Sequence, residues 1–168
     1  MSDDQKAEIP LSEEELRQVT RYAAICAGRV LPLFEAIAPL DTRPKEAIVE
    51  AEAFAEGKRR SGVLRKAGWA ALAAARETDN PIAAHAAYAA SHAAAAAYLH
   101  PIASPHQVKH ILGAAVHMMC ASDTDAASLA NTTVREVLRR YPSPLRGRGR
   151  FNQLLSELDT ALRSNTSQ

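Results

Sequence analysis

Histidines are the residues of this chain whose type and spacing could do chemistry. His85 and His92 are seven residues apart, and so are His110 and His117. Residues seven apart on an α-helix differ by only about 20° around its axis, so each pair occupies one stripe. Imidazole is a common metal ligand and the side chain that titrates nearest to neutral pH. If each pair lies on a helix, the spacing predicts two rows of histidines that could face each other.

An alanine-rich segment has to position the first row. Residues 81–99 consist mainly of alanine, the strongest intrinsic helix former, and a short proline-marked turn separates them from a second apolar segment at 105–121. We expect these segments to form an antiparallel helical hairpin whose small side chains allow close approach. Antiparallel pairing sets two pairs level with each other, namely His92 with His110 and His85 with His117.

A metal centre is one use for such a hairpin. Zinc takes three or four N or S ligands at about 2.0–2.3 Å, and histidines seven apart on a helix, about 10.5 Å along its axis, cannot share an ion. The candidate ligands are therefore His85, His117 and Cys120; a site at His92 and His110 would need a third ligand from elsewhere. The other interpretation, hydrogen-bonded histidines inside the bundle or at its rim, is favoured because HExxH and CxxC motifs are absent. No cofactor is expected, with zinc as the one exception left open.

Composition predicts an all-α fold. The 168 residues are 47% apolar but only 5% aromatic, and the alternating patterns typical of strands are missing. We expect a single-domain array of six to seven helices around a central Ala-rich antiparallel hairpin, covering residues 11–163. Residues 1–10 are expected to be a mobile tail, and residues 164–168 a second, polar tail.

Capping residues and prolines predict where the helices begin and end. A capping box at Ser12 and Glu15 begins the first helix, and Gly28 and Pro32 are expected to end it, followed by a short piece at 33–38. The other helices are expected at residues 43–57, 61–77, 81–99, 105–121, from just after the cap signals at 123–125 to 140, and at 151–162.

Motifs of common enzymes are absent from the sequence. There is no GxSxG elbow, no GxGxxG and no GxxxxGK[ST] phosphate loop. Glu46 and Glu50, four residues apart, could do acid–base chemistry if they faced inward, but an exposed helix face is the ordinary reason for that spacing. We therefore expect no catalytic activity.

Charge and targeting signals bear on the partners and the compartment. The formal net charge is +1, which does not call for nucleic acid or an anionic membrane. An acidic N-terminus and only two cysteines predict a cytoplasmic protein, and the alanine-rich segment is too short and polar for a membrane span.

Three late arginines, Arg146, Arg148 and Arg150, could contact phosphates. No aromatic residue is interleaved among them for base stacking, so a solvated connector is favoured. Acidic residues of the first two helices could instead steer a basic partner; they are Glu13, Glu14, Glu46 and Glu50.

Four motifs suggest a family. They are DTRPKEAI at 41–48, the helix that carries Trp69, AASHAAAAAYLH at 89–100 and HILGAAV at 110–116. Over residues 11–122 the chain resembles the immunity proteins of bacterial polymorphic-toxin systems, specifically the Imm-five-like helical group. The resemblance implies an all-α cytoplasmic protein that binds a cognate toxin and blocks it without catalysis. It places these residues at family positions: Asp41, Arg43 and Pro44 at the start of the second helix, Trp69, and the recurrent histidines His92, His100 and His110.

Two other functions stay open beside the immunity protein. One is a metal-binding helical protein or metal-dependent enzyme built on the histidine hairpin, and the other is a nucleic-acid-associated protein that uses the late arginines. Homo-oligomers also stay open, because small side chains suit packing between two copies as readily as packing within one chain.

Overall fold

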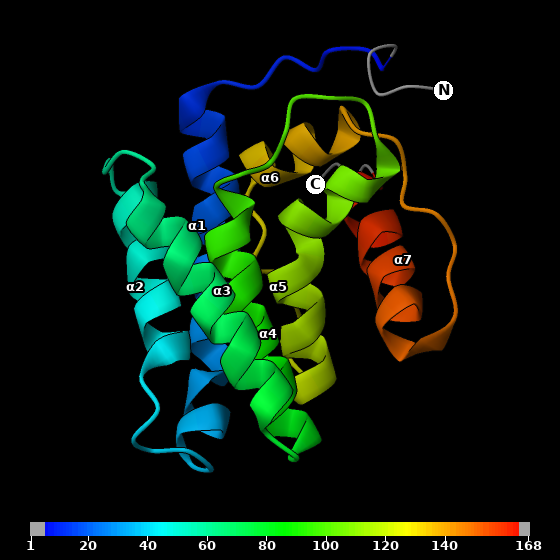
Figure 1. Cartoon of the computed structure of the whole chain (residues 1–168). Helices are drawn as coiled ribbons and strands as arrows, with labels where there is room; N and C mark the ends of the chain where they lie inside the picture. Colours follow the sequence, from blue (N-terminus) through cyan, green and yellow to red (C-terminus); the bar gives the residue numbers. More distant parts are fainter. Residues whose placement is uncertain (1–5, 165–168) are drawn as a thin grey trace.

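The structure is a computed structural model of the chain that describes residues 6–164. Within that range it contains α-helices and no β-strand, which confirms the all-α prediction (Figure 1). The helices are α1 (Glu13–Glu35), α2 (Arg43–Ala55), α3 (Gly62–Glu77), α4 (Pro81–Ala96), α5 (Val108–Ala121), α6 (Thr132–Arg139) and α7 (Gly149–Arg163), with a short 3-10 helix, η2 (Pro105–Gln107), before α5.

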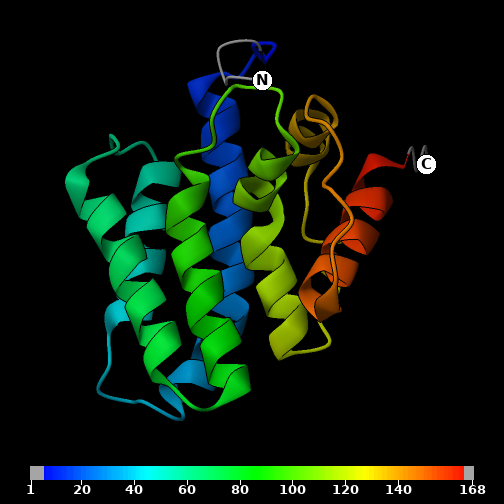
Figure 2. The same ribbon diagram turned by 45° about the vertical axis from the view of Figure 1, so that its right-hand side comes forward.

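Helix α4 lies at the centre of the fold, as the sequence predicts. It packs against α1, α2, α3 and α5, and the α4–α5 hairpin is antiparallel, as the sequence predicts (Figures 1 and 2). Asn80 caps α4 by accepting a hydrogen bond from the backbone N–H of Ala83, and Pro81 occupies the first turn. The buried alanines of α4 point in several directions around its axis, because neighbouring helices cover it on most sides. The methyl side chains let four helices approach one rod closely.

Helix α1 extends beyond its predicted end. It continues to Glu35 with Pro32 inside it, so the separate piece at 33–38 is wrong. Proline removes one hydrogen bond, to the carbonyl four residues earlier. That carbonyl belongs to Gly28, which is exposed and can be solvated. Val30 and Phe34, both buried, hold the chain against the core on either side of the proline.

Helix α6 begins later than the sequence predicts. Asp125 caps a turn instead, because its Oδ1 accepts from the backbone N–H groups of Ala127 and Ser128. Asn131 is the residue that caps α6, accepting from the N–H of Val134. Both are good capping residue types, so the sequence alone does not choose between them.

The predicted N-terminal tail is partly anchored. Ile9 is buried, and its N–H donates to the carbonyl of Pro101 at 2.8 Å. The N–H of Ala103 donates to the carbonyl of Ala7, also at 2.8 Å. Residues 7–9 thus pair with the connection between α4 and η2, which contradicts a free tail there. Residues 1–5 and 165–168 of the predicted tails lie outside the described residues.

The N-terminus of α1 is joined to the C-terminus of α6. The predicted capping box is confirmed, with reciprocal hydrogen bonds between Ser12 and Glu15. The guanidinium of Arg140 donates to both carboxylate oxygens of Glu15, at 2.9 and 2.5 Å. These bonds to Arg140, and then to Ser12, lower the pKa of Glu15 to about 2. One carboxylate therefore caps a helix and binds a second element.

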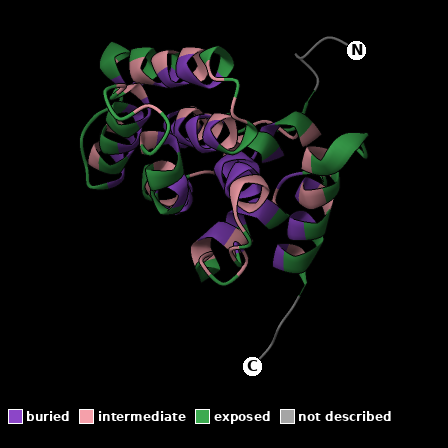
Figure 3. Cartoon of the chain, turned by 90° about the horizontal axis from the view of Figure 1, so that it is seen from below, coloured by how far each residue is buried: buried purple, intermediate pink, exposed green. Residues whose placement is uncertain are grey.

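Burial follows the amphipathic pattern of the outer helices. Figure 3 shows buried residues where the helices face one another and exposed residues on the outside. In α7 the buried leucines are Leu155, Leu158 and Leu162, as the period predicts, and α7 packs against α5 and α6. None of the helices in the described part of the chain is long and apolar enough to cross a membrane.

Candidate functional site

The two rows of histidines meet at His117. Its Nδ1 lies 3.0 Å from Nδ1 of His85, which confirms that these two residues are level across the hairpin. The His117 ring also lies 5.0 Å from the ring of His92 and 5.1 Å from that of Tyr88, centroid to centroid. Phe151 approaches from α7, at 4.7 Å. We refer to His85, Tyr88, His92, His117 and Phe151 as the ring cluster.

Burial keeps the imidazoles of the ring cluster neutral. It is the main cause that lowers the pKa of His117 to about 2, followed by charge repulsion from His92 and His85. Burial also lowers the pKa of His92 to about 4, and it lowers that of His85, with Arg150 as the second cause for His85. The Nδ1–Nδ1 hydrogen bond requires one proton between the two nitrogens, because one must donate and the other accept. The ring cluster therefore acts as a packed, uncharged layer between α4, α5 and α7.

Gly113 of α5 makes room for His92. A Cβ atom at position 113 would lie 2.3 Å from Nδ1 of His92, far inside any normal contact. His92 and His110 line the same cavity between α3, α4 and α5, and the charge of His110 is close enough to lower the pKa of His92. Nδ1 of His110 lies 3.2 Å from the carbonyl oxygen of Ala95. The second predicted pair thus lines one cavity, although His110 faces a backbone carbonyl and not His92.

The predicted metal ligands do not assemble into a metal centre. In residues 6–164, no three His, Cys, Asp or Glu side chains are placed to hold one metal ion, and this includes the set of His85, His117 and Cys120. Burial, the main cause, raises the pKa of the Cys120 thiol, while the nearby Arg150 acts in the opposite direction. His85 and His117 bond to each other instead of converging on a common point with a third donor.

His100 acts through its backbone. Its carbonyl accepts a hydrogen bond from the hydroxyl of Tyr141 at 2.8 Å, and its N–H donates to the side chain of Gln107 at 2.9 Å. The backbone of His100 therefore fixes the turn of the hairpin and connects it to the end of α6.

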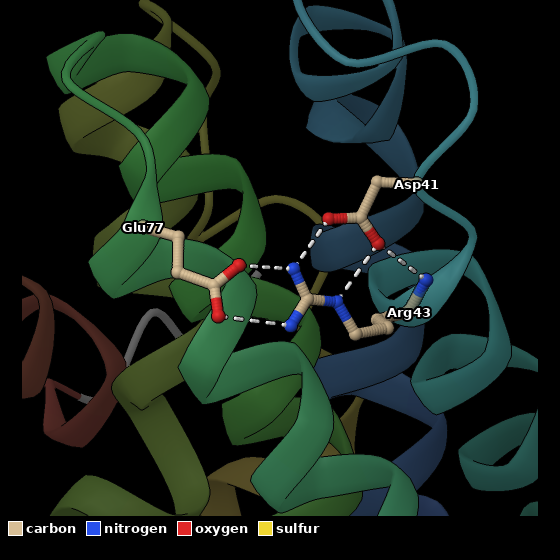
Figure 4. Close-up of polar contacts among 3 residues, drawn as sticks. All are labelled: Asp41, Arg43 and Glu77. Carbon is tan, nitrogen blue, oxygen red and sulfur yellow. Dashed lines mark hydrogen bonds and ion pairs between the residues drawn. The ribbon is translucent and has the colours of Figure 1, made fainter.

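Arg43 joins the start of α2 to the end of α3 (Figure 4). It donates to both carboxylate oxygens of Asp41, at 2.9 and 2.7 Å, and to both of Glu77, at 3.3 and 2.6 Å. The hydrogen bonds with Arg43 lower the pKa of Asp41 and of Glu77. Pro44 is buried in the first turn of α2. Glu77 could not be predicted from the sequence, because it lies 34 residues after Arg43 and has no local signal.

Trp69 does not enter the core. It is 66% exposed on α3, beside a cavity of about 430 Å³ that lies between α3, α4 and α5. Most of the surface that lines the cavity is apolar. The lining residues include Trp69, Leu72, Ala95 and Tyr98, together with His92 and His110. An exposed tryptophan next to an apolar cavity is a feature of binding surfaces.

The predicted acidic surface is not one patch. Glu13 forms an ion pair with Arg17 at 2.8 Å, and Glu50 forms one with Lys58 at 3.2 Å. Glu14 accepts a hydrogen bond from Gln18 on its own helix, and Glu46 accepts one from Thr42, the residue before α2. Because α1 and α2 run antiparallel, Glu46 lies toward the opposite end of the pair from Glu13 (Figure 1).

The late arginines are all exposed but do not form one loop. Helix α7 begins at Gly149, so Arg150 lies in its first turn, and Arg146 and Arg148 precede it. The positive φ of Gly149, 88°, permits that sharp start. Phe151 follows directly, which is how α7 brings an aromatic ring to His117. That Arg146, Arg148 and Arg150 contact phosphates stays a prediction.

Comparison with known proteins gives one match. The model of a family described as Imm-5 like putative immunity protein matches residues 10–143, which is most of the chain and extends from the start of α1 beyond the end of α6. No curated protein and no solved structure matches.

Proposed function

Because the chain belongs to the Imm-5 like immunity protein family, we propose that it neutralises a cognate protein toxin by binding it, without catalysing a reaction. The family match over residues 10–143 is the observation that carries the proposal. We further propose that the protein acts in the cytoplasm, where it would protect the cell that makes the toxin.

Neutralisation by occlusion needs a firm surface rather than a reactive site. The helices here pack around a buried alanine-rich rod, and the ring cluster fills the space toward α7 with neutral side chains. A stable protein–protein complex buries about 800 Å² on each partner. The described chain exposes 9048 Å², so one face of a helix pair would suffice.

The test is protection from the toxin encoded by the gene next to that of this protein. The isolated toxic domain is expressed from an inducible promoter, with and without this chain. We expect co-expression to restore growth and the two purified proteins to form a complex of fixed stoichiometry on size exclusion. A toxin domain from an unrelated system serves as the control. No rescue together with no complex would refute the proposal.

A further inference from the structure

The first part of α3 and the connection before it form the most uneven charge distribution in the chain. Residues 57–76 contain six basic side chains and no carboxylate, in a protein whose formal net charge is +1. Five of these cations, Lys58, Arg59, Arg60, Arg65 and Lys66, occur within nine consecutive residues and are exposed. Lys58 forms an ion pair with Glu50. The positive charges of the other four are therefore less neutralised by carboxylates than that of Lys58.

Large apolar side chains share this region with the cations. Val63 is 57% exposed and Trp69 is 66% exposed, and both border a shallow hollow with Arg65 and Lys66. Tryptophan and arginine are the residue types that most often carry the binding energy of protein interfaces. We refer to Val63, Arg65, Lys66 and Trp69 as the α3 face.

The cavity of about 430 Å³ opens beside the α3 face. Trp69 and Arg65 line it at α3, and Tyr98 lines it just after the end of α4. The guanidinium groups of Arg60 and Arg65 lie over the Tyr98 ring, at 5.5 and 4.8 Å from its centroid. Arg65 and Tyr98 also line a larger cavity of about 850 Å³ toward the start of α1. The guanidinium groups of Arg60 and Arg65 are therefore held at the edge of an apolar cavity that already exists in the unbound protein.

We propose that the α3 face and the cavity beside Trp69 bind the toxin, through an acidic toxin segment that inserts one aromatic or branched aliphatic side chain into the cavity. This inference rests on the proposed function. Charge complementarity identifies the occupant: carboxylates of the toxin meet Arg59, Arg65 and Lys66, and an apolar anchor meets Trp69. Electrostatic attraction of this kind raises the rate of association, and a buried anchor lowers the rate of dissociation.

A protein segment fits this region better than a nucleic acid. Phosphates would satisfy the cations, but a polynucleotide has no flexible apolar side chain to fill the depression between α3, α4 and α5. Moreover, Arg60 is held against the protein, since it donates to the carbonyl of Ala97 at 3.0 Å. The mainly apolar lining of the cavity favours an apolar anchor.

The test compares two variants of the full chain with two matched controls. Trp69→Ala removes the exposed ring, and Lys66→Glu reverses one exposed charge. Leu145→Ala removes another apolar side chain that is 66% exposed, and Lys45→Glu reverses an exposed charge on α2. The purified toxic domain of the neighbouring gene is the first probe, and a 20-nucleotide single-stranded DNA is the second. Kd and association rates are measured at low and high salt, after circular dichroism has checked each fold.

We expect Trp69→Ala to weaken toxin binding at least about tenfold, and Lys66→Glu to slow association and reduce its dependence on salt. The controls should stay within about twofold of the original chain. If the original chain binds the toxin and both α3 variants bind equally well, the docking surface is elsewhere while the proposed function stands. DNA binding that Trp69→Ala abolishes would overturn the inference in favour of nucleic acid. Failure of the original chain to bind the toxin removes the inference together with its premise.

Discussion

Nδ1 of His85 and Nδ1 of His117 lie 3.0 Å apart across the interface of α4 and α5. Only one proton fits between these atoms, so protonation of both rings would place two N–H groups face to face. His117 in turn contacts Phe151, which connects the hairpin to α7. The protonation state of this partly buried pair is thus linked to the packing of three helices.

Stability should fall as the pH decreases below about 6.5. The folded state keeps His92 and His117 neutral, with pKa values of about 4 and 2, whereas unfolded histidines titrate near 6.5. Below pH 6.5 the unfolded chain binds more protons, so the free energy of unfolding decreases by up to about 1.4 kcal/mol per pH unit for each such histidine. The stabilisation is fully present above pH 6.5 and is lost as the pH falls, down to about pH 4 for His92 and about pH 2 for His117. Urea unfolding at pH 7, 6 and 5 measures the slope.

Single variants identify the source of this slope. His117→Gln should reduce the steepness between pH 7 and 5, and His106→Gln, at an exposed histidine, should leave it unchanged. Arg150 and His110, which also lie near these rings, are present in both variants. Equal slopes for the original chain and His117→Gln would contradict the assignment.

Gly113→Ala should destabilise the protein by about 1–3 kcal/mol, the usual cost of overpacking a core. The added methyl would collide with the imidazole of His92, 2.3 Å away, across the interface of α4 and α5. Denaturant unfolding measures the change. The double variant with His92→Ala should lose less stability than the sum of the two single variants, because the collision is then absent.

Gly28→Ala is the control for this substitution. Gly28 is exposed within α1, and nothing lies within 4 Å of a Cβ atom there. Alanine should therefore stabilise the helix by about 0.5–1 kcal/mol. Destabilisation of similar size at both positions would point to the loss of glycine itself, and not to a collision with His92.

Arg43→Lys should lower the Tm by about 2–3 °C. A lysine ammonium cannot make the paired contacts that the guanidinium makes with Asp41 and Glu77 at once. Differential scanning calorimetry measures the shift, and Lys45→Ala, at an exposed position of the same helix, should change it little. An unchanged Tm for Arg43→Lys would mean that this bridge contributes nothing to stability.

Several parts of the site could be predicted because their signals are local. Capping side chains near Ser12 and Pro81 mark helix starts through bonds made within one turn. The seven-residue spacing and the short turn place His85 opposite His117 by helix geometry alone. Tyr88 shares the stripe of His85 and His92, so the same count could have found it.

Other features depend on contacts between distant segments. Phe151 reaches His117 only because α7 packs on α5, and Glu77 reaches Arg43 only because α3 returns beside α2. Pro32 stays within α1 because Val30 and Phe34 are buried on either side of it, against the local preference of proline.

The sequence by itself determined that this chain is helical, that an alanine-rich hairpin is central to it and that two histidines face each other, because helix period and capping act within a few residues. Only the tertiary structure decided which sides of α4 are covered, where the histidines find their partners and that Trp69 stays outside. A helix lined with alanine on most sides has no strong directional preference, so the surrounding helices choose its neighbours.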